Sequence, residues 1–257
     1  MKGWWSAQPL LACYAPLGDP ECPDNILQIY AEHGVDIVEI GVPTSDPYLD
    51  GPTVSNSMRR VLDTKDPVTR INALIGSQAA VFMNRCRLVL MGYADLPFRS
   101  FTQLARQKLV HGLIVADAAL LGDPDRLGEW LESVGLERIG FVDSALSPET
   151  IERARRCGGY VMLQSHGGPT GIRHSLNGNN AEKIMTLRQA GIDLPIVIGF
   201  GIGSAAQAAA AITLGADGVV VGSACIDAAR EGEGSLRRFV VALRQAINAA
   251  PLSAGLG

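Results

Sequence analysis

Residues Ile196-Val197-Ile198-Gly199-Phe200-Gly201-Ile202-Gly203-Ser204 carry the clearest structural signal in this sequence. The segment begins with three β-branched residues, passes through a glycine-rich turn and reaches Ser204, after which the pattern is helical to Leu214. A short apolar strand that leads directly into a helix is typical of a parallel β/α unit. The next unit repeats this arrangement, with a strand at Val219–Val221, a turn at Gly222-Ser223 and helical sequence after it.

The same alternation extends back to the N-terminus. Strands are predicted at Leu10–Ala15, Ile37–Gly41, Leu88–Met91, Leu113–Ala116, Ile139–Val142, Tyr160–Leu163, Ile196–Ile198 and Val219–Val221. Helices are predicted at Asp24–His33, Thr53–Leu62, Val68–Leu74, Arg99–Lys108, Asp125–Val134, Pro148–Arg156 with Ser147 as its N-cap, Ala181–Ala190, Ser204–Leu214 and Leu236–Ala249. Eight such units in 257 residues predict the α/β class and a (β/α)8 TIM barrel, with residues 1–257 as a single domain. The alternative, an open doubly wound sheet, normally has a GxGxxG turn after its first strand, which Pro16–Pro20 lacks.

Composition narrows the function classes. The chain has 22 Lys and Arg against 26 Asp and Glu, a net charge of −4, and no basic run, so no nucleic-acid partner is expected. No apolar segment approaches the roughly 20 residues of a membrane helix, and the N-terminus lacks a signal-peptide core, so we expect a cytoplasmic protein without membrane contact. The cysteines are odd in number and show no CxxC spacing, which favours free thiols over a metal or disulfide framework: Cys13, Cys22, Cys86, Cys157 and Cys225.

The two glycine-rich turns predict a phosphate site. In a barrel of this kind, functional residues lie at the C-terminal ends of the strands, and phosphate binds after strands seven and eight. Gly201 follows the seventh strand, and Gly222 and Ser223 follow the eighth. Glycine lets backbone N–H groups approach an anion, and the following helix presents its positive dipole end. The alternative is that these glycines serve only as tight-turn residues.

A carboxylate within a buried strand is the second signal. Glu39 interrupts the apolar strand Ile37–Gly41, where an unpaired charge is costly. It is therefore either an internally paired side chain or a general acid/base with a raised pKa. Asp46 and Asp50 follow in the loop at residues 42–52, which we predict to be catalytic; for each, the alternative is a turn or helix-capping role.

The connection after the sixth strand is long and rich in glycine. Residues 164–180 are therefore predicted to form a lid loop. His166 and His174 within it are either catalytic or ordinary surface histidines.

Together these motifs resemble a known family. The segment Glu39–Thr53 closely resembles the signature of the tryptophan synthase α subunit family, E-[LI]-G-x-P-x-S-D-P-x-x-D-G-P. Further matches follow in the same order along nearly the whole chain: Leu17–Pro20, Tyr93–Asp95, Val115–Asp117, Thr170-Gly171, Gly199–Ile202 and Gly222–Ala224. The resemblance implies retro-aldol cleavage of indole-3-glycerol phosphate into indole and glyceraldehyde 3-phosphate, with no metal or organic cofactor.

The resemblance also implies roles for individual residues. Glu39 would protonate C3 of the indole ring and later take a proton from the glycerol hydroxyl. Asp50 would accept the indole N–H and stabilise the positive charge on the ring. The remaining substrate-binding residues would be Tyr14 and Tyr93 beside the indole and glycerol, Thr170 as the lid residue that orders Asp50, and Gly171, Gly201, Gly222 and Ser223 around the phosphate.

The chain also departs from the family pattern. Leu96–Arg99 lacks the usual Asn-Asn-Gly stretch of the face that meets the β subunit, and Asp117–Leu120 lacks the usual Val-Pro. Met162 and His166 stand where the family has Tyr and Arg. Because catalytic positions are kept while partner-facing ones change, we expect a divergent member, either with a β subunit as partner or as a stand-alone lyase.

Two other functions remain open at this level. One is a related barrel aldolase or isomerase that acts on another aryl or sugar phosphate. The other is a non-catalytic binding partner, which the presence of both Glu39 and Asp50 disfavours.

Overall fold

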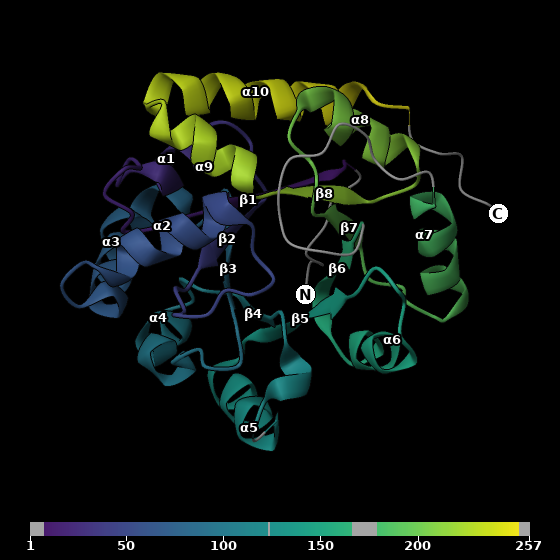
Figure 1. The fold of residues 1–257 in the computed structure, drawn as a ribbon, viewed down its shortest axis with the longest axis horizontal. Helices are drawn as coiled ribbons and strands as arrows, with labels where there is room; N and C mark the ends of the chain where they lie inside the picture. Colours follow the sequence, from purple (N-terminus) through teal and green to yellow (C-terminus); the bar gives the residue numbers. More distant parts are fainter. Residues whose placement is uncertain (1–7, 123, 166–178, 252–257) are drawn as a thin grey trace.

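Eight parallel strands close into a barrel in the order β1-β2-β3-β4-β5-β6-β7-β8, with β8 pairing back onto β1 (Figure 1). The computed structural model describes residues 8–122, 124–165 and 179–251. The strands are β1 Leu10–Ala15, β2 Ile37–Gly41, β3 Arg87–Gly92, β4 Gly112–Val115, β5 Glu137–Val142, β6 Gly158–Gln164, β7 Ile196–Gly199 and β8 Gly218–Val221. The predicted TIM barrel is confirmed, and the closure of β8 onto β1 rules out the open sheet.

Helices form a ring around this barrel (Figure 1). They are α1 Ile26–Glu32, α2 Pro52–Leu62, α3 Pro67–Phe82, α4 Thr102–Arg106, α5 Pro124–Val134, α6 Pro148–Arg155, α7 Asn180–Gln189, α8 Ala205–Thr213, α9 Ser223–Arg230 and α10 Glu233–Ala249, with 3₁₀ turns η1 Phe98–Phe101 and η2 Ala118–Leu120. Within the described ranges, no helix has the length and apolar character needed to cross a bilayer.

Three predictions about helices need correction. Helix α3 continues past the predicted end at Leu74 because Ile75 and Phe82 extend its buried face. The helix predicted at Arg99–Lys108 is a 3₁₀ turn followed by the short α4. Ser147 does stand at the N-cap position of α6, but its side chain makes no capping bond. Its hydroxyl instead donates to the Asp143 carboxylate at 2.8 Å, which ties the end of β5 to the helix.

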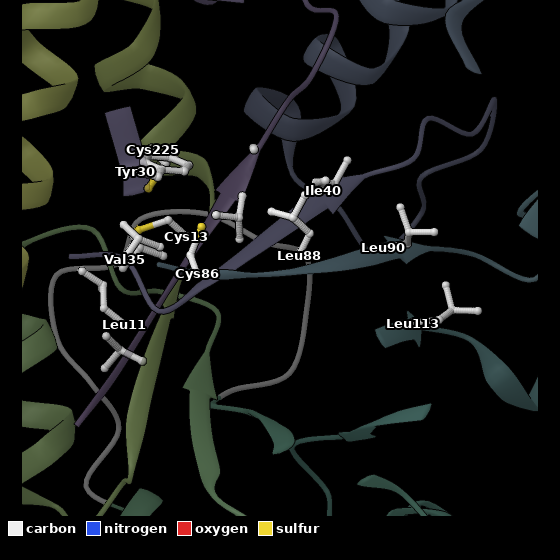
Figure 2. Packing of buried hydrophobic residues seen from close by; sticks show 14 of the residues in the cluster. Leu11, Cys13, Tyr30, Val35, Ile40, Cys86, Leu88, Leu90, Leu113 and Cys225 are labelled. Atoms are coloured by element: carbon white, nitrogen blue, oxygen red, sulfur yellow. The ribbon is translucent and has the colours of Figure 1, made fainter. Parts of the chain in front are cut away.

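Alternation along the strands produces two apolar layers. Leu10 and Ala12 of β1 face the interior of the barrel, where they join residues of other strands such as Val89 and Val197. Their neighbours Leu11 and Cys13 face outward and pack under the helices. Figure 2 shows this outer layer, with Tyr30 of α1 and Cys225 of α9 close to Cys13. The helix-facing layer holds the barrel wall in place and leaves the interior face for the site.

The last helix is tied to the first two strands by one arginine. The Arg244 guanidinium of α10 donates to the carbonyl oxygens of Pro9 and Gly34, each at 2.9 Å, and pairs with Asp36. Asp36 also accepts the backbone N–H of Leu11 at 2.8 Å. These bonds join the C-terminal part of the chain to the starts of β1 and β2.

Candidate functional site

Seven of the nine predicted site residues line one cavity at the C-terminal end of the barrel: Tyr14, Glu39, Asp50, Tyr93, Gly201, Gly222 and Ser223. Thr170 and Gly171 lie outside the described residues, as do His166, His174 and most of the predicted lid. The cavity measures about 40 Å³, because the side chains around it nearly fill the mouth. Several of those side chains are flexible thioethers: Met58, Met91 and Met162.

Glu39 lies on the inner face of β2 and is fully buried. Its register partners are Tyr14 on β1 and Val89 on β3. The phenol of Tyr160 donates to Oε1 at 2.5 Å, while Oε2 is buried and has no hydrogen-bond partner among the described residues. Burial raises the pKa of Glu39 from its ordinary value of 4.5 to about 7, against the lowering effect of the Tyr160 bond. One oxygen is thus held in place and the other is available to a ligand.

Tyr160 was not among the predicted site residues. A tyrosine in an apolar strand looks like an ordinary core aromatic, and Tyr160 is fully buried. The available signal was its spacing, since Tyr160 lies two residues before Met162 and therefore shares its inward face. Burial, followed by the charge of Glu39, raises the pKa of Tyr160 well above its usual range, so the phenol remains a hydrogen-bond donor.

Asp50 enters the same cavity from the loop after β2. Tyr93, just beyond β3, donates its hydroxyl to Asp50 Oδ2 at 2.8 Å and accepts the backbone N–H of Leu49 at 3.2 Å. Burial and the nearby Asp50 charge both raise the pKa of Tyr93, which keeps its proton on the phenol. Tyr48 packs against the Tyr93 ring with the centroids 5.4 Å apart. Tyr93 therefore fixes both the carboxylate and the loop that carries it.

The structure also settles the capping alternatives for the two aspartates. The N-cap position of α2 is Gly51, so neither aspartate occupies that position. Asp50 instead bonds Tyr93, and Asp46 is exposed on the loop and does not line the cavity. Of the two, only Asp50 is placed to meet a ligand in the barrel.

Tyr14 reaches the cavity because β2 has a glycine opposite it. A Cβ placed on Gly41 would lie 1.7 Å from the Tyr14 hydroxyl oxygen, so any larger residue would displace the ring. The Tyr14 carbonyl accepts the Tyr30 hydroxyl at 2.8 Å, which fixes the backbone of β1 at this point. Gly41, two residues after Glu39, thus leaves space for the Tyr14 ring at the wall of the cavity.

The loop after β1 is anchored to α2 by a buried ion pair. Asp19 is 1% exposed and accepts from Arg60 Nη2 and from the Ser57 hydroxyl, both at 2.6 Å. Burial alone would raise the pKa of Asp19, but these hydrogen bonds outweigh it and leave the pKa lowered. The anchored α2 follows directly on the loop that bears Asp50.

The two glycine turns are not equivalent. At the end of β7, Phe200 and Gly201 have φ of 68° and 93°, a left-handed pair that costs Phe200 about 1–2 kcal/mol. The start of α8 is already capped, because Ser204 accepts the N–H of Gln207. By contrast, α9 begins after Gly222 with no side-chain cap. Its first N–H groups are therefore the ones left for an anion.

No group of three or more His, Cys, Asp or Glu side chains within the described ranges is arranged to hold a metal ion. The described residues that line this cavity offer two carboxyl groups, the phenols of Tyr14 and Tyr93, the Ser223 hydroxyl and backbone N–H groups.

Comparison with known proteins gives a consistent result. A family model described as "Tryptophan synthase alpha chain" matches residues 6–251. A relative of that name from Mycobacterium avium is 36% identical over 235 residues, which cover 85% of this chain and 81% of the relative. Another from Geobacter sulfurreducens is 32% identical, with 94% of each chain covered. A solved structure described as Mycobacterium tuberculosis tryptophan synthase superposes with a TM-score of 0.79 at 30% identity, over 94% of this chain and 93% of that one.

Proposed function

Because this chain belongs to the tryptophan synthase alpha chain family, we propose that its barrel mouth cleaves indole-3-glycerol phosphate into indole and glyceraldehyde 3-phosphate. Family membership makes the protein a lyase. The observation that carries the specific reaction is Glu39, a buried carboxyl group with one unpartnered oxygen that lines the same cavity as Asp50 and the Gly222 turn.

The pKa of Glu39 suits a group that both gives and takes a proton. At a pKa of about 7, both protonation states are populated near neutral pH, which is the condition for efficient acid/base catalysis. Glu39 in its acid form would protonate C3 of the indole ring through Oε2. As the carbon–carbon bond breaks, its electron pair returns to the ring, the glycerol hydroxyl becomes the aldehyde, and Glu39 takes up the hydroxyl proton. Glu39 is therefore protonated again at the end of the reaction, as it was at the start.

Asp50 would supply a negative charge that stabilises the positive charge formed on the indole ring. Protonation at C3 places positive charge on the indole nitrogen, and an ionised carboxylate that accepts the N–H stabilises that charge. The Tyr93 hydroxyl donates to Oδ2 and so holds the Asp50 carboxyl group in position for this contact. Two carboxyl groups in different surroundings thus take different roles, as the chemistry requires.

The substrate would lie across the mouth with its phosphate at the start of α9. Gly201, Gly222 and Ser223 border the cavity there, and Tyr14 and Tyr93 border it on the side of β1 to β3. Since the cavity is only about 40 Å³, an indole ring needs side chains to move. The thioethers of Met91 and Met162 are well suited to such movement.

We further propose that a β-type subunit is the protein partner, as expected for a relative of chains found in tryptophan synthase structures. All the groups assigned to the lyase step belong to the α-type chain itself. Indole release should therefore be detectable without the partner.

The deciding experiment is a turnover assay with indole-3-glycerol phosphate, in which indole is quantified by chromatography with and without a tryptophan synthase β chain. Glu39→Gln should lower kcat by about 10²–10⁴, the usual size of an acid/base contribution. The matched control is Glu182→Gln, an exposed carboxylate on α7 that should leave kcat unchanged. Absence of indole in both arms, or equal loss in the two variants, would contradict the proposal.

A further inference from the structure

A second cavity, of about 340 Å³, lies between β4 and β5 and the helices α5 and α6. None of its lining residues borders the cavity at the barrel mouth. Its volume falls within the range of about 300–1,000 Å³ that is typical of small-molecule sites. It lies where β4 and β5 pair over only two residues each, Gly112–Leu113 with Glu137–Arg138.

One end of this second cavity carries two arginines without partners. Arg138 at the start of β5 and Arg153 on α6 are both half-buried, and neither guanidinium makes a hydrogen bond or ion pair with the described residues. Burial raises the pKa of Cys157 to about 11, while both guanidinium groups act to lower it, which places the two cations near the same thiol. Two unpaired cations at one partly dry site favour an anion.

The other end is acidic. Asp117 and Asp143 follow the last residues of β4 and β5. Asp143 accepts the Ser147 hydroxyl, and Asp117 accepts the Tyr48 hydroxyl through Oδ2, while its Oδ1 is buried without a partner among the described residues. Arg138 lies five positions before Asp143, a span of roughly 16 Å at the usual rise per residue of a strand. The cavity is therefore positively charged at one end of β5 and negatively charged at the other.

The wall between the two ends is apolar. Leu113 of β4 and Leu127 and Leu131 of α5 face the cavity and are all nearly fully buried. Phe141 closes it on the side of β5. Apolar side chains would shield a ligand body placed here from water on both sides, which favours the binding of an apolar group.

We propose that this second cavity binds an organic anion with an apolar body, its charged head between Arg138 and Arg153 and its body against Leu131. Asp117 and Asp143 repel the head from the opposite end and so set the orientation. The site shares no lining residue with the barrel mouth, and the residues proposed to hold the ligand, Arg138, Arg153 and Leu131, all lie outside that mouth.

The test is a calorimetric titration of the full chain with three eight-carbon probes: octanoate, 1-octanol and octyltrimethylammonium. We expect octanoate to bind at least about tenfold more tightly than the alcohol, and the cation no more tightly than the alcohol. Repetition at saturating glycerol 3-phosphate, which would occupy the proposed phosphate site at the barrel mouth, should leave the octanoate affinity unchanged. Equal affinity for octanoate and octanol, or competition by glycerol 3-phosphate, would overturn the proposal.

Variants test separately the contacts proposed for the charged head and for the apolar body of the ligand. Arg138→Met combined with Arg153→Met should bring octanoate to the affinity of octanol, while Arg156→Met, at the exposed C-cap position of α6, should change neither affinity. Leu131→Trp should weaken both probes by filling the cavity. An effect of Arg156→Met equal to that of the double variant would show a general charge effect and contradict the site. If Leu131→Trp fails to fold, the arginine variants still decide the question.

Discussion

At the scale of single residues, Glu39 places an ionisable group where the barrel would otherwise be apolar. Its isolated position within Ile37–Gly41 made it predictable, since a carboxylate in a buried strand needs a reason to be there. Its hydrogen-bond partner was not predictable in the same way. A phenol can pack in a core as an aromatic ring or serve as a donor, and only the fold brings Tyr160 to Glu39 across 121 residues of sequence.

The raised pKa of Glu39 predicts how stability depends on pH. The pKa is 4.5 in its ordinary state and about 7 in the fold, so between these values the folded chain retains a proton that the unfolded chain releases. Stability therefore declines as pH rises through this window, by about 3 kcal/mol at 1.36 kcal/mol per pKa unit, and the loss is complete above the folded pKa.

Urea unfolding of the wild type and of Glu39→Gln at pH 5 and pH 8 measures this effect. The free energy of unfolding should fall more between pH 5 and pH 8 in the wild type than in the variant, whose amide does not titrate. Parallel changes in the two proteins would show that Glu39 titrates at its ordinary value.

At the scale of elements, the two glycine turns show what a sequence pattern can and cannot reveal. Both turns match the position where a barrel binds phosphate, and the sequence gives no reason to rank them. The difference arises from side chains of the helices themselves. Ser204 and Gln207 occupy the start of α8, whereas no side chain caps α9. The second cavity was equally invisible in the sequence, because its volume depends on how α5 and α6 sit over β4 and β5.

The open start of α9 gives a prediction for Gly222. A Cβ at this position would meet no atom of the described residues within 4 Å apart from its chain neighbours, so Gly222→Ala should leave the thermal midpoint nearly unchanged. The added methyl group would border the proposed phosphate site, so KM for indole-3-glycerol phosphate should rise by about tenfold, or about 1.4 kcal/mol.

Gly76→Ala is the matched control for this substitution. It also places a methyl group in open space, but within α3, where it should add up to about 1 kcal/mol of stability without a change in KM. An unchanged KM in Gly222→Ala would place the phosphate elsewhere.

At the scale of the whole molecule, the order of the strands was predictable from the β/α period, but the means of closing the barrel was not. Nothing in the sequence around Arg244 indicates that it reaches Pro9, Gly34 and Asp36, which are more than 200 residues away. Such contacts follow from the circular arrangement, which brings the last helix beside the first two strands.

The contacts of Arg244 with Pro9, Gly34 and Asp36 predict a measurable effect on stability. Arg244→Met should lower the free energy of unfolding by about 1–3 kcal/mol, because the Pro9 and Gly34 carbonyls and the partly exposed Asp36 carboxylate would all lose one charged donor. Arg237→Met on the same helix breaks only partly exposed pairs with Glu32 and Glu233 and should cost less than about 1 kcal/mol. Urea unfolding measures the free energy lost in each variant. Similar losses would mean that the Arg244 contacts add little beyond an ordinary surface pair.

The pairing of β8 with β1 also bears on when the protein acquires activity during its synthesis. Tyr14 leaves the ribosome early, whereas Ser223, which borders the same pocket, is translated about 200 residues later. A nascent chain in which β8 and α9 still occupy the exit tunnel cannot close the barrel. Ligand binding at the barrel mouth should thus begin only after α9 has left the ribosome, and products truncated before β8 should be inert rather than partly active.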